Sequence, residues 1–351
     1  MTSLSTPHHD PVTAKPRATM RHVAALAGVG VKTVSRVVNG EPNVSAATIA
    51  KVRDAARQLN FEPDIHAGNL RRADRRSQTL GLLVGSVANP FSGAIHRAVE
   101  DAAAEKGIAV FASSLDDDPT RERGIVSTFL RRRVDGLILT TASKSQGYLL
   151  PELEHGTPIV FVDREPVGVE ADAVVSDNAN GAAVATRHLI EHGHTRIAFL
   201  GDREDIWTMR ERRRGYRDEL GRAGISSNDA QVIGGIVDEQ AARQAVDDLL
   251  ASGNPPTAIF SSQNLITTGA IRSLRDNDAG HRIALVGFDD IALADLLDPA
   301  ITVVAQNPQR IGALAAERVL AKLDGDTTAD QTYVVPTTLI VRGSGEIRPN
   351  E

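Results

Sequence analysis

Residues 31–39, VKTVSRVVN, combine an apolar stripe with side chains that hydrogen-bond to nucleic acid. Val34 and Val37 recur at helical spacing and would pack on a scaffold, which leaves the polar side chains to meet a DNA groove. Arg36 presents a planar fork that can bond to a guanine edge. Short hydroxyl and amide side chains suit phosphate oxygens, and here these are Thr33, Ser35 and Asn39. The stretch therefore predicts a helix that reads the major groove.

Three short helices would have to position this stretch. Residues 20–27 carry apolar side chains on one helical face, and residues 28–30 (Gly-Val-Gly) end that pattern before it resumes at 31–38. Ser45 is a suitable N-cap for a third helix that runs to Leu59. Two helices joined by a glycine-containing turn, with a third closing the core, indicate a helix-turn-helix domain. A dinucleotide-binding loop at these glycines is excluded, because they follow a helix and not a strand.

The string MRHVAALAGVGVKTVSRVVNG at residues 20–40 resembles the lac/galactose repressor family, whose motif reads nearly V-A-x-x-A-G-V-S-x-x-T-V-S-R-V-L-N-G. The resemblance extends over about residues 20–343 and implies a bacterial transcription regulator. The family's base-reading positions fall on Val31, Lys32 and Arg36. Gly30 stands where the family usually has a serine, so we expect a slightly weaker helix cap and the loss of one phosphate contact.

The same resemblance implies a hinge helix within residues 61–76. Ala67 and Leu70 fall on its minor-groove positions, where an apolar wedge such as leucine unstacks and bends the duplex. Gly68 disfavours a helix, and a short isolated helix is marginal in water, so we expect the hinge to become ordered only on DNA. A plain linker is the alternative interpretation.

Beyond residue 77, short apolar runs alternate with amphipathic segments. Continuous Val, Ile, Leu and Phe runs separated by helices indicate parallel sheets covered on both faces. The runs lie at residues 80–85, 109–112, 136–139, 159–162, 197–201, 258–260 and 283–287. The number of these runs is greater than one compact sheet would hold. The predicted fold is an N-terminal all-α helix-turn-helix domain followed by two doubly wound parallel-sheet lobes, an α/β core that resembles the periplasmic sugar-binding proteins.

These boundaries give an expected organisation of five parts. A disordered tail at residues 1–17 precedes the helix-turn-helix domain at 18–60 and the hinge and linker at 61–76. The two-lobed effector-binding and dimerisation domain takes residues 77–343, and a second tail follows at 344–351. Within the two-lobed part, lobe 1 is expected at about 77–177 and 307–336, and lobe 2 at about 178–306 and 337–343.

Polar residues directly after the apolar runs mark a ligand cleft, because ligands of such sheets bind beyond the carboxyl ends of the strands. Asp163 and Asp289 can accept hydroxyl hydrogens, Arg210 can fork across adjacent oxygens, and Phe91 or Trp207 can present a ring to a sugar face. These segments resemble the family's N-P-F, V-D-R, A-R, N-D and G-F-D-D signatures. The implied effector-binding residues are Asn89, Phe91, Asp163, Trp207, Arg210, Gln263, Asn264 and Asp289. The set predicts a sugar or related polyol.

One pair departs from the family pattern. Gln263-Asn264 stands where the family has Asn-Asp, so one carboxylate becomes an amide, which gains a donor and loses a charge. The sequence does not identify which ligand this exchange selects. It also leaves open the operator sequence and whether the effector acts as inducer or corepressor.

The net charge of −6 is unevenly distributed. Through Gln78 the chain has 12 basic and 6 acidic residues, whereas the remainder has 27 and 39. A basic head on an acidic body favours contact of the head alone with a polyanion. The absence of cysteine excludes disulfides and thiolate metal sites. We find no secretory signal and no apolar stretch of membrane length, so we expect a cytoplasmic protein without a membrane partner.

The expected partners are double-stranded operator DNA, a small-molecule effector and a second copy of the chain. One helix-turn-helix reads only half of a pseudo-palindromic operator, and no heptad tail indicates a coiled-coil tetramer, so we expect a homodimer. No cofactor is indicated. His188, His192 and His194 resemble an ordinary helix end, so no metal is expected either, and the arginine triplets at 131–133 and 212–214 are expected on exposed helix faces.

Two other classes of protein remain as alternative hypotheses. A solute-binding protein without a DNA role would need export, which the missing signal and the intact head disfavour. An enzyme built on the α/β lobes would need a reactive site, and the sequence has no nucleophile elbow, metal spacing or Walker loop.

Overall fold

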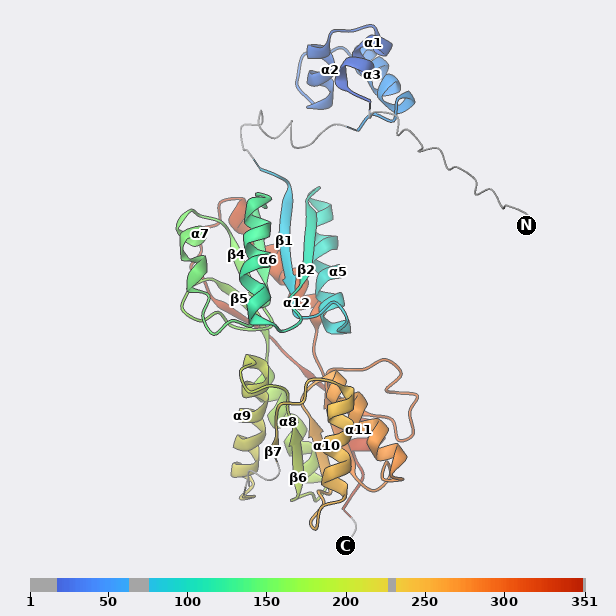
Figure 1. Ribbon diagram of the computed structural model, residues 1–351, viewed down its shortest axis with the longest axis vertical. Coiled ribbons are helices and arrows are strands. Elements are labelled where there is room, and N and C mark those ends of the chain that lie inside the picture. Colours follow the sequence, from blue (N-terminus) through green and yellow to red (C-terminus); the bar gives the residue numbers. More distant parts are fainter. Residues whose placement is uncertain (1–17, 63–75, 227–231, 350–351) are drawn as a thin grey trace, which may run out of the picture. The chain divides into compact units, whose positions relative to one another are not determined.

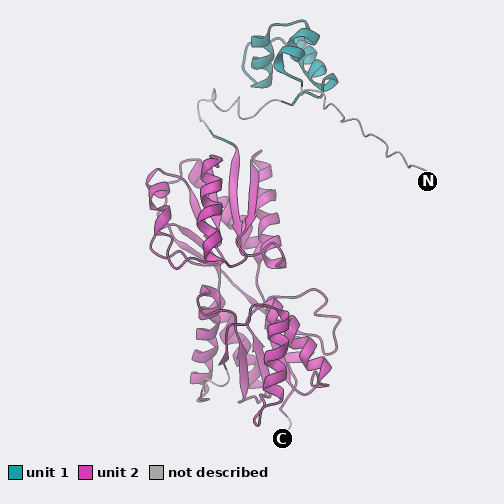
Figure 2. Ribbon diagram, in the orientation of Figure 1, with its two compact units in different colours: residues 1–77 teal, residues 78–351 magenta. Residues whose placement is uncertain are grey.

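The computed structural model describes residues 18–62, 76–226 and 232–349. The chain divides into two compact units, Met1–Ser77 and Gln78–Glu351, shown in teal and magenta in Figure 2. We call the described part of the first unit the head and the second unit the body. Among the described residues no helix is both long and apolar enough to span a membrane.

The head is a three-helix domain. Its helices are α1 (Met20–Ala27), α2 (Val31–Val38) and α3 (Ala46–Gln58), which confirms the three helices predicted from the sequence. Thr19 caps α1 in a capping box with His22, and the Ser45 hydroxyl accepts the Thr48 N–H at the start of α3. The small core consists of Val23, Ala24, Val34, Val52 and Ala55.

Glycine makes the turn between the first two helices possible. Gly28 has φ of +65°, in the left-handed region that ends a helix and that other residues rarely adopt. The turn brings Val34 of α2 against Val23 and Ala24 of α1, and all three side chains are buried. The polar side of α2 is thereby left outside the core.

Lobe 1 of the body contains a six-stranded, all-parallel sheet (Figure 1). Its strand order is β11-β5-β4-β3-β1-β2. The strands are β1 (Thr79–Val84), β2 (Ala109–Ser114), β3 (Gly136–Leu139), β4 (Ile159–Val162), β5 (Asp172–Ser176) and β11 (Thr332–Val335). The helices are α5 (Pro90–Glu105), α6 (Pro119–Arg131), α7 (Leu150–Glu154) and α12 (Pro308–Leu323), with a 3-10 turn η1 at Gly147–Leu149.

Lobe 2 repeats this plan with one antiparallel edge strand. Its order is β12-β10-β9-β8-β6-β7, and only β12 runs antiparallel. The strands are β6 (Ile197–Leu200), β7 (Val232–Ile233), β8 (Ala258–Ser261), β9 (Ala284–Phe288), β10 (Thr302–Ala305) and β12 (Thr338–Ile340). The helices are α8 (Asn178–Glu191), α9 (Trp207–Arg222), α10 (Glu239–Leu250) and α11 (Asn264–Asp276), with a 3-10 turn η3 at Gly343–Gly345.

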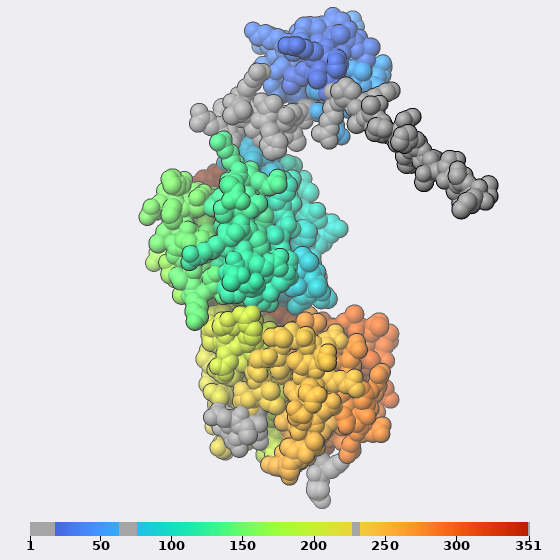
Figure 3. Space-filling view, viewed as in Figure 1, coloured from blue at the N-terminus to red at the C-terminus, as the bar shows by residue number. Residues whose placement is uncertain are grey.

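Four apolar clusters hold the two sheets to their helices. In lobe 1, one cluster packs the sheet on α5 and α12, and a second packs its other face on α6 and the segment around Leu149. In lobe 2, the sheet packs on α8 and α9 on one side and on α10 and α11 on the other. Figure 3 shows the lobes meeting at a waist, lobe 1 mostly in cyan and green and lobe 2 mostly in yellow and orange. The predicted fold class is confirmed.

The chain passes between the lobes three times. The crossings lie between β5 and α8, between β10 and α12, and between β11 and β12. The tail expected from residue 344, however, begins too early. The buried Ser344 hydroxyl donates to the Leu285 carbonyl oxygen (2.6 Å) and accepts the Thr302 N–H (2.9 Å), and the Ile347 carbonyl oxygen lies 2.7 Å from Nε2 of His194. This segment satisfies polar groups at the edge of lobe 2 and so belongs to it.

A glycine on α9 allows close approach of α8. A Cβ atom added at Gly215 would lie 1.9 Å from the carbonyl oxygen of Ala179. Because backbone cannot move aside cheaply, we expect Gly215→Ala to lower the free energy of unfolding by about 3 kcal/mol, at the upper end of overpacking costs. Urea unfolding of the full chain measures this, followed by the fluorescence of Trp207, its single tryptophan.

Gly221 on the same helix provides the matched control. No atom lies within 4 Å of a Cβ added there, so Gly221→Ala is expected to raise stability by about 0.5–1 kcal/mol through helix propensity alone. Equal effects of the two substitutions would show that the α8–α9 approach tolerates a methyl group.

Candidate functional site

Helix α2 exposes the three side chains predicted to read bases. Val31, Lys32 and Arg36 are all exposed, and Val31 has 43% of its surface accessible even though it is apolar. The N-cap, Gly30, makes no side-chain hydrogen bond, as expected from the missing serine. Arg36 makes a solvent-exposed ion pair, its Nε lying 3.7 Å from Glu41. Such a pair contributes little, so Arg36 is available to a ligand.

The predicted phosphate-binding side chains lie beside these. Thr33, Ser35 and Asn39 are half-buried, and Nδ2 of Asn39 donates to Oγ of Ser35 at 3.4 Å. Helix α2 thus presents exposed tips flanked by short polar groups, which is the arrangement a groove-binding helix requires. The hinge positions Ala67 and Leu70 lie outside the described residues.

In the body, polar residues gather where the strands of both lobes end. They line a pocket of about 300 Å³, which we call the inner pocket. Apart from Arg212, which lies within α9, each comes within a few residues of a strand end: after β1, β2 and β4 in lobe 1, and after β6, β8, β9 and β10 in lobe 2. Its charged and amide residues are Asn89, Asp116, Asp117, Asp163, Arg164, Asp202, Arg203, Arg212, Gln263, Asp289 and Gln306.

Asp163 and Asp289 occupy equivalent positions in the two lobes. Each directly follows a strand, β4 or β9, and each has a left-handed backbone, with φ of +69° and +75°. Their N–H groups donate to Val174 (3.0 Å) and Val304 (2.9 Å) on the neighbouring strands. For a non-glycine residue such a backbone costs about 1–3 kcal/mol, and it is typically retained at functional sites. With this backbone conformation, both side chains line the inner pocket.

Arg212 was expected on an exposed helix face, and this prediction was wrong. It is 5% exposed, and its guanidinium donates to Oδ1 of Asn178 (2.7 Å) and to the Ser262 carbonyl oxygen (2.6 Å). The group also lies 3.8 Å from the centre of the Phe288 ring. Burial lowers the pKa of Arg212, and the nearby Asp289 and Asp163 carboxylates oppose this effect. Sequence reasoning missed it, although Met209, Arg212, Tyr216 and Leu220 share the buried face of α9.

Burial also acts on the carboxylates of the pocket. It raises the pKa of Asp163, and it raises the pKa of Asp202 despite an N–H bond from Arg203. Arg164 behaves differently. Burial alone would lower the pKa of Arg164, but the Asp117 and Asp163 carboxylates raise it above the usual value. The pocket therefore holds buried ionisable groups that would gain from a hydrogen-bonding ligand.

One hydrogen bond between the amides predicted for the site joins the two lobes. Nδ2 of Asn264 donates to Oδ1 of Asn89 at 2.8 Å, across the cleft, and the Asn264 N–H donates to Oδ2 of Asp289 at 3.3 Å. Nε2 of Gln263 donates to Oδ2 of Asp202 at 3.3 Å. A carboxylate at position 264, as in the family pattern, has no hydrogen to donate to this oxygen, so the Asn264 amide supplies a donor that an aspartate would lack. Phe91 lines the same pocket.

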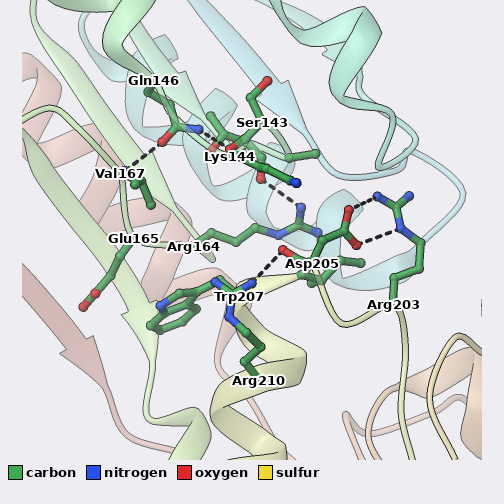
Figure 4. A pocket seen from close by; sticks show the side chains of 13 residues that line it. Ser143, Lys144, Gln146, Arg164, Glu165, Val167, Arg203, Asp205, Trp207 and Arg210 are labelled. Carbon is green, nitrogen blue, oxygen red and sulfur yellow. Dashed lines mark hydrogen bonds and ion pairs between the residues drawn. The ribbon is translucent and has the colours of Figure 1, made fainter.

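Trp207 and Arg210 lie apart from the other predicted residues. They line a second pocket of about 320 Å³, the outer pocket, with residues 141–146 and 164–167 of lobe 1 (Figure 4). Nη1 of Arg210 donates to the carbonyl oxygens of Asp205 (2.9 Å) and Glu204 (3.3 Å). Trp207 packs on the apolar cluster of lobe 1. The two pockets share Arg164, Arg203 and Ile206.

Comparisons with known proteins decide the family. Residues 19–64 match the model of the bacterial regulatory proteins of the lacI family, and residues 186–345 match a periplasmic binding protein-like domain. The HTH-type transcriptional regulator GalR of Escherichia coli (strain K12) is 34% identical over 329 residues, which is 93% of this chain and 95% of that protein. The chain belongs to the lacI family. This confirms the resemblance inferred from residues 20–40.

Further relatives extend the likeness over nearly the whole chain. The ribose operon repressor of E. coli (strain K12) is 31% identical, over 93% of this chain and 99% of the repressor. The crystal structure of a lac repressor dimer bound to operator and the anti-inducer ONPF matches with a TM-score of 0.84 at 26% identity, over 94% of this chain and 99% of that one. A CelR–cellobiose complex matches at 33% identity with a TM-score of 0.67, over 93% and 100%. This lacI-family chain is a DNA-binding transcription regulator with an effector-binding body.

Two of the histidines near the end of α8, His192 and His194, have structural partners for their rings. Nδ1 of His194 lies 2.9 Å from the Thr257 hydroxyl, and Nδ1 of His192 lies 2.7 Å from the His188 carbonyl oxygen. Within the part of the chain that the structure describes, no three His, Asp or Glu side chains are grouped to hold a metal ion.

Proposed function

We propose that this chain binds a pseudo-palindromic operator as a homodimer, probing bases with α2, and represses transcription under the control of a sugar or related polyol. The observation that carries the effector class is the inner pocket. Two carboxylates on strained strand ends, Asp163 and Asp289, face it together with the buried guanidinium of Arg212.

The chemistry of these groups suits vicinal hydroxyls. Carboxylates accept two hydroxyl hydrogens each, and a guanidinium donates to adjacent oxygens in a fork. The Phe91 ring adds an apolar surface for the C–H face of a sugar. Among the relatives, CelR is found in complex with cellobiose and another is a repressor of a ribose operon, which supports the same ligand class. We propose Asn89, Phe91, Asp163, Arg212, Gln263, Asn264 and Asp289 as the effector-binding residues.

On the head, we propose that Val31, Lys32 and Arg36 contact bases, with Thr33, Ser35 and Asn39 on phosphates. The exposure of the first three and the partial burial of the others support this division. We also propose that the chain acts in the cytoplasm and catalyses no reaction. Its relatives are likewise named as regulators and repressors.

The test combines an effector screen with operator binding. We expect one of a panel of mono- and disaccharides to raise the melting temperature of the full chain, because a ligand bound only to the folded state stabilises it by mass action. The same sugar should change the affinity for a DNA fragment selected by the protein from a random pool. If the protein bound specific DNA but no sugar changed its melting temperature or DNA affinity, the proposed effector class would be wrong. If the protein selected no DNA sequence from the random pool, the proposed binding to a specific operator would be wrong.

A further inference from the structure

The outer pocket has cationic side chains that a neutral polyol bound in the inner pocket would not contact. It lies between the lobes, since residues 141–146 and 164–167 form one wall and residues 203–210 the other. Arg164, Arg203 and Ile206 line both pockets, so the two are adjacent. A ligand larger than one sugar ring could therefore occupy both.

The two pockets differ in the sign of their charge. The outer pocket is lined by four cationic side chains, Lys144, Arg164, Arg203 and Arg210, and by the carboxylates of Glu165 and Asp205. The inner pocket is lined by three cationic side chains and five carboxylates. Hydroxyl groups suit the inner pocket, where carboxylates predominate, whereas an anion suits the outer pocket, where cations predominate.

Two of the outer cations are available to a ligand. Arg164 pairs with Asp117, and Arg203 pairs with Asp205. Lys144 and Arg210, by contrast, have no carboxylate within ion-pair distance among the described residues, and Arg210 bonds only to backbone carbonyl oxygens. In Figure 4 the Glu165 carboxylate points away from the guanidinium groups. An incoming anion would thus meet Lys144 from lobe 1 and Arg210 from lobe 2.

The start of α9 adds to this positive environment. Its N-cap residue, Ile206, provides no side-chain hydrogen bond, and both Ile206 and Trp207 line the outer pocket. An uncapped helix N-terminus carries positive partial charge and free N–H donors, which bind anions. Arg164 adds a cation where the two pockets adjoin: it is 7% exposed, and its Nε has no hydrogen-bond partner, although it lies 3.6 Å from Oδ2 of Asp163.

Buried polar side chains hold the lobe 1 wall in place. The fully buried Glu122 accepts N–H bonds from Ala142 (2.7 Å) and Ser143 (2.8 Å). Gln146, 1% exposed, donates to the Ser143 carbonyl oxygen (2.7 Å) and accepts the Val167 N–H (2.8 Å). These bonds tie the loop that carries Lys144 to the loop after Arg164. The wall is therefore preorganised, which reduces the entropic cost of binding there.

We infer that the effector is a sugar that carries an anionic group, a phosphate ester or a carboxylate, with the sugar in the inner pocket and the anion between Lys144, Arg210 and the start of α9. This inference rests on the proposed sugar-responsive function and specifies its ligand. The anion bridges the two lobes, so it would stabilise their closed arrangement.

The single tryptophan allows a direct test, because Trp207 lines the outer pocket. Fluorescence titrations of the full chain would compare neutral galactose, glucose and ribose with galactose 1-phosphate, glucose 6-phosphate, ribose 5-phosphate and glucuronate, and with inorganic phosphate. We expect an anionic sugar to bind about tenfold or more tightly than its neutral parent, since an ion pair of a partly buried group contributes at least this much. Phosphate esters and glucuronate distinguish the two sources of the anion.

The variants Lys144→Gln and Arg210→Gln are expected to bring the affinity for the anionic sugar down toward that of its parent, with the neutral sugar little affected. Lys106→Gln, which removes an exposed cation at the end of α5, is the charge-matched control and should preserve the ratio. Thermal unfolding checks that all variants fold. A neutral parent that binds as tightly as its anionic form, or an unchanged ratio in both pocket variants, would overturn the inference and leave the sugar-responsive function intact. Failure of every sugar to bind would overturn both.

Discussion

Replacing Arg212 with alanine is expected to weaken effector binding by about 100-fold or more, the usual effect of truncating one partner in a buried, charge-assisted contact. The guanidinium lines the inner pocket together with Asp163, Asp202 and Asp289, and it is held by hydrogen bonds to Asn178 and Ser262. Operator affinity without effector should be unchanged, because Arg212 belongs to the body and the base-reading helix to the head. Calorimetric titration with the sugar identified in the screen, and a gel-shift titration with operator, measure the two affinities.

Arg214 on the same helix is the matched control. Its guanidinium is 57% exposed and pairs with Glu211, so Arg214→Ala should leave effector affinity unaltered. Because loss of a buried cation between carboxylates can destabilise the fold, Arg212→Lys provides a second variant. It retains the charge but loses the fork, and we expect it to fold and to bind effector weakly. Unaltered binding by a folded Arg212→Lys would show that the fork is not a ligand contact.

Local sequence patterns were sufficient for the head and for most of the central strands. The helices of the head have short apolar repeats bounded by Thr19, Gly28 and Ser45, and capping residues act within a few positions of where they stand. Strands such as β1, β4 and β6 are buried on both faces, so they appear as continuous apolar runs.

The strands that local patterns missed depend on distant partners. β5 begins with Asp172, a fully buried carboxylate that bonds to Arg318 and to the Gln331 N–H. Its edge neighbour β11 alternates exposed and buried residues over only four positions. Nothing within either segment shows that these partners exist. A charged residue such as Asp172 therefore argues against a buried strand when the sequence is read alone.

The candidate site shows the same division. Asp163 and Asp289 were predictable because strand ends can be located from apolar runs. The choice between Arg210 and Arg212 depended on which side of α9 faces the sheet, and a run of arginines at 212–214 obscures an apolar face at helical spacing. The cross-lobe bond of Asn89 with Asn264, and the position of Arg164 on the lining of both pockets, each depend on segments far apart in the sequence. Such contacts between lobes leave no local signal.

For the head, we expect Arg36→Ala to weaken specific operator binding by about 1–3 kcal/mol, or roughly 5- to 150-fold, and to relax the preference at one base pair of each half-site. The side chain is exposed on α2, and its ion pair with Glu41 is weak enough for DNA to replace. Competition gel shifts with operators that carry each single-base substitution measure both effects.

The salt dependence of binding then separates base reading from phosphate anchoring. A cation on a phosphate releases about one counterion, so its removal lowers the slope of log affinity against log salt by about one, whereas loss of a base contact leaves that slope nearly unchanged. Arg57→Ala on α3, which removes a 79% exposed guanidinium paired with Asp54, is the control for general loss of positive charge. If Arg36→Ala weakened all sequences equally and reduced the slope as a phosphate contact does, Arg36 would be an anchor, and sequence discrimination by α2 would have to come from Val31 and Lys32.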